Sequence, residues 1–477
     1  MAGTPVVRGD EEEPMEDSAL QDKLEELATE LEVPGVSVGV LADGQERYAY
    51  HGLTSVENPL PVDENTLFQF GSTGKTYTAT AIMRLVDQGR VSLEAPVRTY
   101  LPDFRLKDPD VAEKVTVLHL LNHTAGWEGD LMTNTGDGDD ALERYVALMA
   151  DLEQVTPLGT TVSYNNASLS VAGLIVARQC GTTYEQAIRD LLFSPLGLDQ
   201  TWFFANDIMT RRFSVGHTHH DQGKTTVNRP WALPRGNAPA GGMSATSRDL
   251  IAWARFHLGD GTAPDGTRLL SKELLDRMKE PTADMRGSAL GDYVGISWLL
   301  RDVDGVRLVG HGGTTNGQYS DFVMVPERGF ALTSMANCGP NGSQLNHSLS
   351  RWALEHYLGV IDKDPEPIVL GDDVLASFAG RYETIAATCH ITVDSGRLLA
   401  KIDVKPEMRK VLSEAGEEIP DDEPPFVLGL LHADGNDYVI AEGPAKGMKG
   451  YFVRDRDGSV TGVHLGGRLA TRVGVTA

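Results

Sequence analysis

The first three quarters of the chain begin and end with stretches in which apolar and polar residues alternate, as they do in β-strands. A long helix-rich stretch separates these two regions. Near the N-terminus, 36–53 alternates around an Asp43-Gly44 turn and predicts a hairpin. Downstream, 293–313 and 320–337 predict two more hairpins, and a helical pattern at 342–359 follows them. This order predicts an antiparallel sheet that contains strands from both ends of this region. We expect helices to flank the sheet and a helical lobe to lie beside it. The expected fold class is therefore α+β.

The helices expected around and between these hairpins are marked by apolar residues at helical spacing. One begins near Ser18, where Leu24 and Leu27 share a face. Another follows Ser72 and ends at Gly89, a residue type typical of helix C-termini. Further helices are expected in the middle of the chain at 141–150, 166–179, 183–193 and 247–258.

Beyond the terminal helix the pattern changes to short β-runs separated by turns. With 477 residues, the chain exceeds the usual size of one hydrophobic core, so a second domain is expected. The predicted parts are a disordered acidic tail, 1–17, a large domain, 18–361, a Pro-containing linker, 362–373, and a second domain, 374–477. Strands and Asp-Gly turns in the second domain predict a small all-β barrel or sandwich.

Charge and cysteine content exclude several classes of partner. The chain has 42 Lys+Arg against 68 Asp+Glu, a formal net charge of −26, and this field repels nucleic acid and anionic membrane surfaces. Its three cysteines, Cys180, Cys338 and Cys389, match no zinc-binding spacing. The acidic N-terminus lacks the apolar core of a secretory signal, and no apolar run is long enough to cross a bilayer. We therefore expect a cytoplasmic protein that binds no nucleic acid, membrane, metal or cofactor.

The segment FQFGSTGKTYT, 68–78, is compatible with two different active sites. Gly74-Lys75-Thr76 matches the end of a nucleotide-binding P-loop, whose first glycine should then be at position 69. Gln69 occupies that position, and a side chain is costly at such a tight turn. Ser72 and Lys75 match instead the S-x-x-K of enzymes that form an acyl-enzyme on serine. We favour the second interpretation.

The start of a helix suits a nucleophilic serine, because the helix N-terminus offers positive potential and free N–H groups to an oxyanion. Lys75 lies three residues after Ser72 on the same face, so its amine can approach the serine oxygen. Tyr164-x-Asn166 precedes an apolar helix, and His311-Gly312-Gly313 ends a β-run where glycines let a strand approach a substrate closely. Taken singly, these are equally compatible with a capping serine, a packing tyrosine and a turn histidine. Together, in this order, they indicate a catalytic site.

In this combination the chain resembles the serine β-lactamase and penicillin-binding-protein superfamily. The similar branch contains class C β-lactamases, D-alanyl-D-alanine carboxypeptidases, D-aminopeptidases and β-lactamase-like esterases. The boxes S-x-x-K, Y-x-N and K-T-G or H-x-G correspond to Ser72–Lys75, Tyr164–Asn166 and His311–Gly313. Flanking stretches such as VTVLHLLNHTAGW and AGGMSATSRDLIAWARF are also similar. The resemblance covers roughly 20–360, and LASFAGRYE with the β-runs after it resembles the lipocalin-like C-terminal domain of some members.

The resemblance implies a role for each box. Ser72 would be the nucleophile that forms the acyl-enzyme. Lys75 and Tyr164 would activate it, and Tyr164 would relay the proton to the leaving group. Asn166 would orient the acyl side of the substrate and Lys75. The backbone N–H groups of Ser72 and Thr314 would form the oxyanion hole.

The third box departs from the lactamase pattern. His311 and Gly313 would line the substrate site, and His311 stands where lactamases carry a lysine that meets the substrate carboxylate. A mostly neutral imidazole replaces that cation. The departure weakens the case for a β-lactamase or a typical carboxypeptidase and favours D-aminopeptidase-like or esterase-like substrates.

Other polar and aromatic residues are weaker candidates. His217-x-His219-His220-Asp221 could hold a metal, but no distant ligand cluster joins it, and we expect a polar surface loop. His123 is expected to make a structural hydrogen bond. Four tryptophans are expected in the core or in a pocket wall, namely Trp127, Trp202, Trp231 and Trp298.

The favoured function is a serine hydrolase that cleaves a carboxylic ester or a D-residue-containing peptide or amide through an acyl-enzyme. One alternative keeps the acyl-enzyme and passes it to an amine, as a peptide cyclase or transpeptidase would. Two others are a β-lactamase and a non-catalytic scaffold or ligand-sensing protein. The expected partner is a small-molecule ester or peptide substrate, and the sequence does not determine the oligomeric state.

Overall fold

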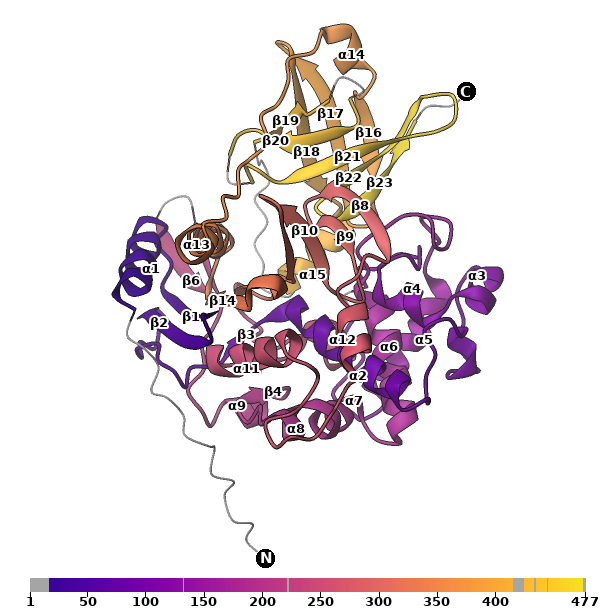
Figure 1. Ribbon diagram of the computed structural model, residues 1–477. Coiled ribbons are helices and arrows are strands. Elements are labelled where there is room, and N and C mark those ends of the chain that lie inside the picture. Colours follow the sequence, from indigo (N-terminus) through magenta and orange to yellow (C-terminus); the bar gives the residue numbers. More distant parts are fainter. Residues whose placement is uncertain are drawn as a thin grey trace, which may run out of the picture.

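The computed structural model describes 17–131, 133–220, 223–414, 424–432, 435–443 and 445–474. It consists of a larger mixed α/β domain and a closed β-barrel formed by the C-terminal part of the chain (Figure 1). The expected acidic tail lies outside the described residues except for Asp17, whose side chain accepts a hydrogen bond from Leu20 N and caps the first helix.

The main sheet of the larger domain has nine strands in the order β2-β1-β14-β13-β11-β10-β9-β8, with β12 paired to β13. All of its pairings are antiparallel. Because β1 pairs with β14 about 300 residues downstream, both ends of the domain complete the sheet, as the order of elements predicts. The strands are β1 (Gly35–Ala42), β2 (Gln45–Gly52), β8 (Ala283–Ser288), β9 (Gly291–Val294), β10 (Leu299–Val303), β11 (Val306–Gly310), β12 (Gly313–Thr314), β13 (Tyr319–Val325) and β14 (Phe330–Ala336).

Every residue of β1 is buried, because helices cover both faces of the sheet. Val36 and Val38 face α1 (Ser18–Glu30) and α13 (Asn341–Leu358), which share one apolar core with them. Alternate positions face α11 (Ser247–Leu258), where Ile251 leaves no space for a side chain on Gly39. The alternation follows from the two-residue period of a strand.

The helical lobe lies beside the sheet and surrounds α2 (Lys75–Asp87), which follows a 3₁₀ turn, η1 (Gly71–Gly74) (Figure 1). Its largest helix, α6 (Asn166–Cys180), is capped by Asn165 at its start and by Gly181 at its end. Two expected helices change type at their ends: α5 continues as the 3₁₀ turn η3, and α7 as the π-turn η4. The remaining elements of the domain are η2 (Val97–Thr99), α3 (Pro109–Lys114), α4 (Val117–Leu121), α5 (Ala141–Ala147), η3 (Leu148–Asp151), α7 (Tyr184–Ile188), η4 (Arg189–Phe193), α8 (Ser194–Leu196), α9 (Ala205–Ile208), η5 (Arg235–Asn237), α10 (Ala238–Gly241), α12 (Lys272–Arg277) and η6 (Pro326–Arg328).

The larger domain also contains two small three-stranded sheets. One has the order β3-β7-β4 (Phe68–Gln69, Ser244–Ala245 and Thr201–Trp202), and the other has the order β15-β5-β6 (Cys338–Gly339, His217–His220 and Lys224–Val227). The expectation of a surface loop at the histidine cluster was therefore wrong. β5 is a strand, and His217 is buried, with its ring nitrogens bonded to Val56 N and Asn337 O.

The C-terminal domain is a closed barrel of eight antiparallel strands, in which β23 returns to pair with β16. Its core is separate from the cores of the larger domain and contains Phe378, Tyr382 and Phe452. Closure leaves no open edge strand. Its elements are α14 (Asp372–Ala376), β16 (Gly380–Glu383), β17 (Ala387–Asp394), β18 (Arg397–Val404), α15 (Pro406–Glu414), β19 (Phe426–Leu430), β20 (Asp437–Ile440), β21 (Lys449–Arg454), β22 (Val460–Leu465) and β23 (Arg468–Val473).

The barrel lies over the β8 end of the main sheet and reaches the helical lobe (Figure 1). Arg286 of β8 stacks on the ring of Tyr451, with 4.6 Å between guanidinium and ring centre, and lies 3.8 Å from Asp437. At the tip of the β22–β23 hairpin, a Cβ on Gly467 would lie 2.4 Å from Leu290 Cδ1, so the hairpin is packed tightly against the larger domain. In the described part of the chain, no helix combines the length and apolar character needed to span a bilayer.

Candidate active site

Ser72 lies in the 3₁₀ turn η1, and α2 begins at Lys75. Residues three apart eclipse one another in a 3₁₀ turn, so the lysine side chain is aligned with the serine. Lys75 Nζ donates a hydrogen bond to Ser72 Oγ over 2.9 Å. Ser72 itself is half-buried, whereas Lys75 is fully buried. The S-x-x-K spacing therefore produces the contact that the sequence predicts.

The environment of Lys75 favours the neutral amine. Its second hydrogen-bond partner is the carbonyl oxygen of Ala240 in α10, at 2.7 Å. Burial lowers the pKa of Lys75 well below its ordinary value, and the nearby Arg468 lowers it further, whereas Asp130 acts in the opposite direction. An uncharged amine in contact with Ser72 Oγ can accept the hydroxyl proton.

Tyr164, just before α6, lies on the other side of this contact. Lys75 Nζ is 4.8 Å from the centre of its ring. Burial raises the pKa of Tyr164 above its ordinary value, although the interaction of its hydroxyl with Ser72 and the charge of Arg468 lower it in part. The resting tyrosine is therefore a neutral phenol that can donate a proton.

Behind this pair, His123 is fully buried with a positive φ of 60° and supports the tyrosine. Its ring lies 4.4 Å from that of Tyr164, and its Nδ1 accepts a hydrogen bond from Asn165 N. The structural hydrogen bond expected for His123 is therefore present.

The third box brings a second backbone N–H close to Ser72. A Cβ on Gly313 would lie 2.0 Å from Phe70 O and 2.7 Å from Ser72 N, and a Cβ on Gly71 would lie 2.7 Å from Thr314 N. Only glycines permit this approach of β12 to η1. The N–H groups of Ser72 and Thr314 are thus neighbours, as an oxyanion hole requires.

Side chains hold the two segments in this position. Thr73 Oγ1 donates to His311 O over 2.8 Å, and Ser320 Oγ donates to Phe70 O over 2.8 Å. Gln318 Oε1 accepts a hydrogen bond from Gln69 N at 3.0 Å. These bonds come from residues on either side of the boxes, which sequence reasoning did not single out.

His311 is buried and presents a neutral ring to the site. Burial, with a contribution from Lys75, lowers its pKa to about 3. Nδ1 lies 2.6 Å from Gly312 O and so carries the proton, which leaves Nε2 as an acceptor. Among the described residues nothing hydrogen-bonds that Nε2, and the ring lies 6.1 Å from that of Tyr164.

Asn166, the first residue of α6, has a partner that the sequence did not predict. Its Nδ2 donates to Asp130 Oδ1 over 2.9 Å, whereas Lys75 is held by Ala240 O. The expectation that Asn166 orients Lys75 is therefore wrong for these bonds, because each side chain is held by a different partner. Asp130 also forms a two-pronged ion pair with Arg468 of the barrel. Neither Asp130 nor Arg468 lies in a recognisable motif, so no signal in the sequence identifies them.

The other candidates lie elsewhere. Trp127 and Trp298 are core residues, and Trp202 is covered by Arg211 at 3.9 Å. Trp231 borders a small cavity of about 20 Å³ next to Gln69. Among the described residues no three His, Cys, Asp or Glu side chains cluster as metal ligands would.

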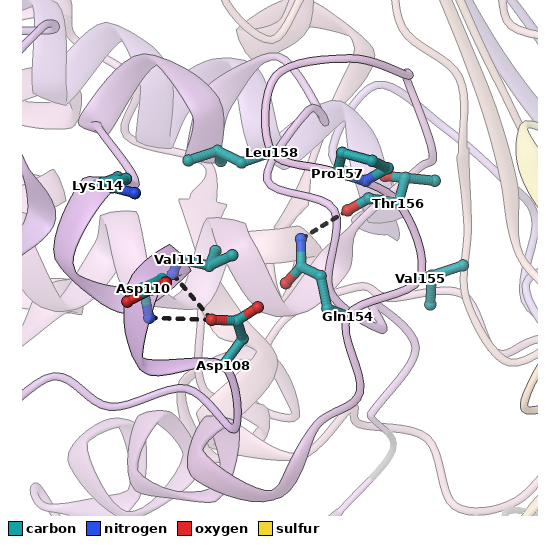
Figure 2. Close-up of a pocket in the computed structure, with 9 residues that line it drawn as sticks. All are labelled: Asp108, Asp110, Val111, Lys114, Gln154, Val155, Thr156, Pro157 and Leu158. Atoms are coloured by element: carbon teal, nitrogen blue, oxygen red, sulfur yellow. Dashed lines mark hydrogen bonds between the residues drawn. The ribbon is translucent and has the colours of Figure 1, made fainter.

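A larger surface hollow of about 500 Å³ lies on the helical lobe, between α3 and the segment 154–158 (Figure 2). In Figure 2, Asp108 caps the start of α3 and Gln154 bonds Thr156 O, so these two polar side chains at its wall bond the backbone. None of the three boxes lines this hollow. The hollow is therefore separate from the candidate site around Ser72.

Comparison with known proteins agrees with this arrangement. Residues 20–353 match the sequence profile of the family described as Beta-lactamase. The chain is 36% identical to "Penicillin-binding protein 4" of Amycolatopsis lactamdurans over 381 residues, which cover 78% of this chain and 98% of that protein.

Solved structures are similar over one or both domains. The crystal structure of SurE has 26% identity and a TM-score of 0.74, and the match covers 96% of this chain and 99% of that one, so it includes the barrel. The D-amino acid amidase from Ochrobactrum anthropi SV3 has 25% identity and a TM-score of 0.60, covering 71% and 98%. With the family profile spanning most of the larger domain and all three boxes, this chain belongs to the β-lactamase family.

Proposed function

We propose that this protein is a serine hydrolase that cleaves a carboxylic ester or a D-residue-containing peptide or amide through an acyl-enzyme on Ser72. The observation that carries the proposal is the 2.9 Å contact between Ser72 Oγ and a buried lysine whose pKa is well below its ordinary value. Burial of a lysine is costly, and groups with such shifted pKa values cluster at functional sites.

The proposed steps use the contacts described above. Ser72 Oγ attacks the substrate carbonyl carbon as its proton passes to Lys75, and the oxyanion forms between the N–H groups of Ser72 and Thr314. The bond to the leaving group then breaks, and Tyr164 donates a proton to the departing oxygen or nitrogen while it recovers one from Lys75. Water next attacks the acyl ester, its proton returns along the same path, and Ser72 is regenerated.

The neutral third box sets the expected substrate class. His311 offers an acceptor nitrogen and no positive charge, because its pKa of about 3 keeps the ring neutral. An acceptor suits a substrate N–H or O–H, whereas a carboxylate gains most from a cation. Similarity to a D-amino acid amidase supports substrates with a D-residue. β-Lactams that carry a carboxylate are expected to be poor substrates.

Transfer of the acyl group to an amine is the second candidate. It is favoured by the position of the barrel hairpin, which covers Tyr164 and leaves its side chain buried. A covered acyl-enzyme is less accessible to bulk water, and a bound amine can then compete for it.

The test is a panel of p-nitrophenyl esters, D-amino-acid p-nitroanilides and nitrocefin, with and without a D-amino-acid amide as acceptor. Mass spectrometry detects the acyl-enzyme and separates hydrolysis products from amide products. We expect an adduct on Ser72 that is absent in Ser72→Ala and present in the control Ser343→Ala, whose side chain is exposed on α13. Unchanged labelling in Ser72→Ala would refute the assignment.

A further inference from the structure

The tip of the β22–β23 hairpin is bonded directly to the segment that carries Tyr164. Tyr164 N donates to Gly467 O over 2.9 Å. His464 Nε2 lies 3.1 Å from Val162 O, and Leu469 N lies 3.4 Å from Ser163 Oγ. The barrel therefore contacts three consecutive residues, 162–164, that lead into the second box.

Arg468, the first residue of β23, extends from this hairpin into the larger domain. Its Nε and Nη2 bond the two carboxylate oxygens of Asp130, and its Nη1 bonds Gly466 O. The guanidinium lies 5.1 Å from the centre of the Tyr164 ring. The side chain of Arg468 is 35% exposed and that of Asp130 is 18% exposed, so the pair is partly shielded from water.

This ion pair is connected to the candidate catalytic residues on two sides. Asp130 Oδ1 accepts from both Arg468 Nη2 at 3.0 Å and Asn166 Nδ2 at 2.9 Å. Because only the amide NH₂ can donate to a carboxylate, this bond fixes which way Asn166 faces and turns its Oδ1 away from Asp130. On the other side, the guanidinium packs on the tyrosine ring.

We propose that Arg468 is a positioning residue of the candidate active site, supplied by the barrel, which fixes Asn166 through Asp130 and holds Tyr164 and the local charge in their working arrangement. The proposal rests on the acyl-enzyme function above. Docking of the barrel is then a condition of catalysis, and the larger domain alone has an incomplete site.

The charges of Arg468 and Asp130 should affect the pH–rate profile, which a purely structural contact would not change. Arg468 and Asp130 act on Lys75 with opposite sign, the first lowering and the second raising its pKa. Removing one partner leaves the other unopposed. The groups that face or surround Lys75 are Ser72, Tyr164, Asp130, Arg468, His123 and His311.

The expected shifts follow from these signs. Acylation needs the neutral amine, so the acidic limb of the pH–rate profile reports the pKa of Lys75. In Arg468→Gln the unpaired Asp130 raises that pKa, and the limb moves to higher pH. In Asp130→Asn the unpaired Arg468 lowers it, and the limb moves to lower pH. In the double variant the two effects cancel, and the limb returns close to the wild-type position.

The experiment uses the full-length protein and two probes, fluorophosphonate labelling of Ser72 and kcat/KM for p-nitrophenyl butyrate, between pH 5 and 10. Arg468→Gln should lower kcat/KM by about 10²-fold, mainly in kcat, because misplaced catalytic groups cost on that order. Arg468→Lys keeps the charge and loses the two-pronged geometry, so the limb should stay at the wild-type pH with a smaller loss of rate.

The matched control is Arg286→Gln, which removes a different contact between the domains, to Asp437 and Tyr451, outside the candidate site. Its pH limb should be unchanged. Single variants that shift in the same direction, or Arg468→Gln with wild-type kcat/KM, would overturn the positioning role while Ser72 labelling leaves the proposed function intact. A wild-type protein that shows neither labelling nor ester turnover would overturn both proposals.

Discussion

The two domains contribute to the candidate site by different means. In the larger domain, Ser72, Tyr164 and His311 come from segments far apart in sequence, and the backbones approach so closely that no side chain fits at Gly71 or Gly313. The barrel has its own closed core and contributes the side chain of Arg468 from a hairpin tip. The larger domain thus determines the positions of the candidate catalytic groups, and the barrel contributes part of the charge around them.

The largest expected effect is in the larger domain, where one substitution should lower activity and raise stability. Lys75→Met should lower kcat/KM by about 10³-fold, because it removes the base. It should also raise the melting temperature. The folded-state pKa of Lys75 lies below the unfolded value of about 10.4, so the buried lysine destabilises the fold most at low pH and not at all above about pH 10.4.

The stability gain of Lys75→Met should therefore shrink as the pH rises towards 10. Calorimetry across that range measures it. The control is Lys279→Met, which replaces another largely buried lysine, one that donates to His257 O outside the site. Equal loss of activity in the control would argue against a specific role for Lys75.

The second prediction tests whether the barrel unfolds on its own. Phe452 is fully buried in the barrel core and packs on Phe378 with ring centres 4.5 Å apart. Phe452→Ala should cost the barrel about 3–5 kcal/mol. We expect one calorimetric transition to move down while the transition of the larger domain stays in place.

A separate experiment, limited proteolysis, tests the domain boundaries. Limited proteolysis should cut in 362–373, where Val369 is 98% exposed, and leave two folded pieces. If Arg468 positions the candidate site, ester turnover should be lost over the same temperature range in which the barrel unfolds. One shared transition that moves as a whole would show that the two domains form a single cooperative unit.

The third prediction compares added methyl groups in the two domains. Gly313→Ala would place a Cβ 2.0 Å from Phe70 O, so β12 must move away from η1. We expect kcat/KM to fall by about 10²-fold, as when an oxyanion-hole donor is displaced. Gly458→Ala in the barrel turn meets no atom within 4 Å, although its φ is +87°. It should cost about 1 kcal/mol of barrel stability and leave turnover unchanged.

The smallest effect concerns substrate preference. His311→Lys should raise the ratio of kcat/KM for nitrocefin to that for p-nitrophenyl butyrate about fivefold, because a charged hydrogen bond exceeds a neutral one by about 1 kcal/mol. With a pKa of about 3, His311 stays neutral, so the wild-type ratio should be constant between pH 5 and 8. Wild-type turnover of nitrocefin above that of esters and D-aminoacyl substrates would contradict the proposed substrate class.

Much of the fold and the boxes could be predicted from local patterns. The hairpin at 36–53, the helix at 247–258 and the strand-rich C-terminus rest on periodicity and turn residues, which act over a few neighbours. The contact of Ser72 with Lys75 follows from their spacing alone. The histidine strand β5 was missed because its polar residues give no strand pattern, and one of its two partners, β15, lies more than 100 residues away.

The sequence by itself determined the family boxes, their order and the α+β and all-β division, because these depend on residue type and short spacing. Only the tertiary structure decided that Lys75 is buried against Ala240 O and that Asp130 joins Asn166 to Arg468. The pKa of a lysine depends on desolvation and on charges brought in by distant segments. Arg468 lies 338 residues from Asp130, and only the docking of a separate domain places that cation beside Tyr164.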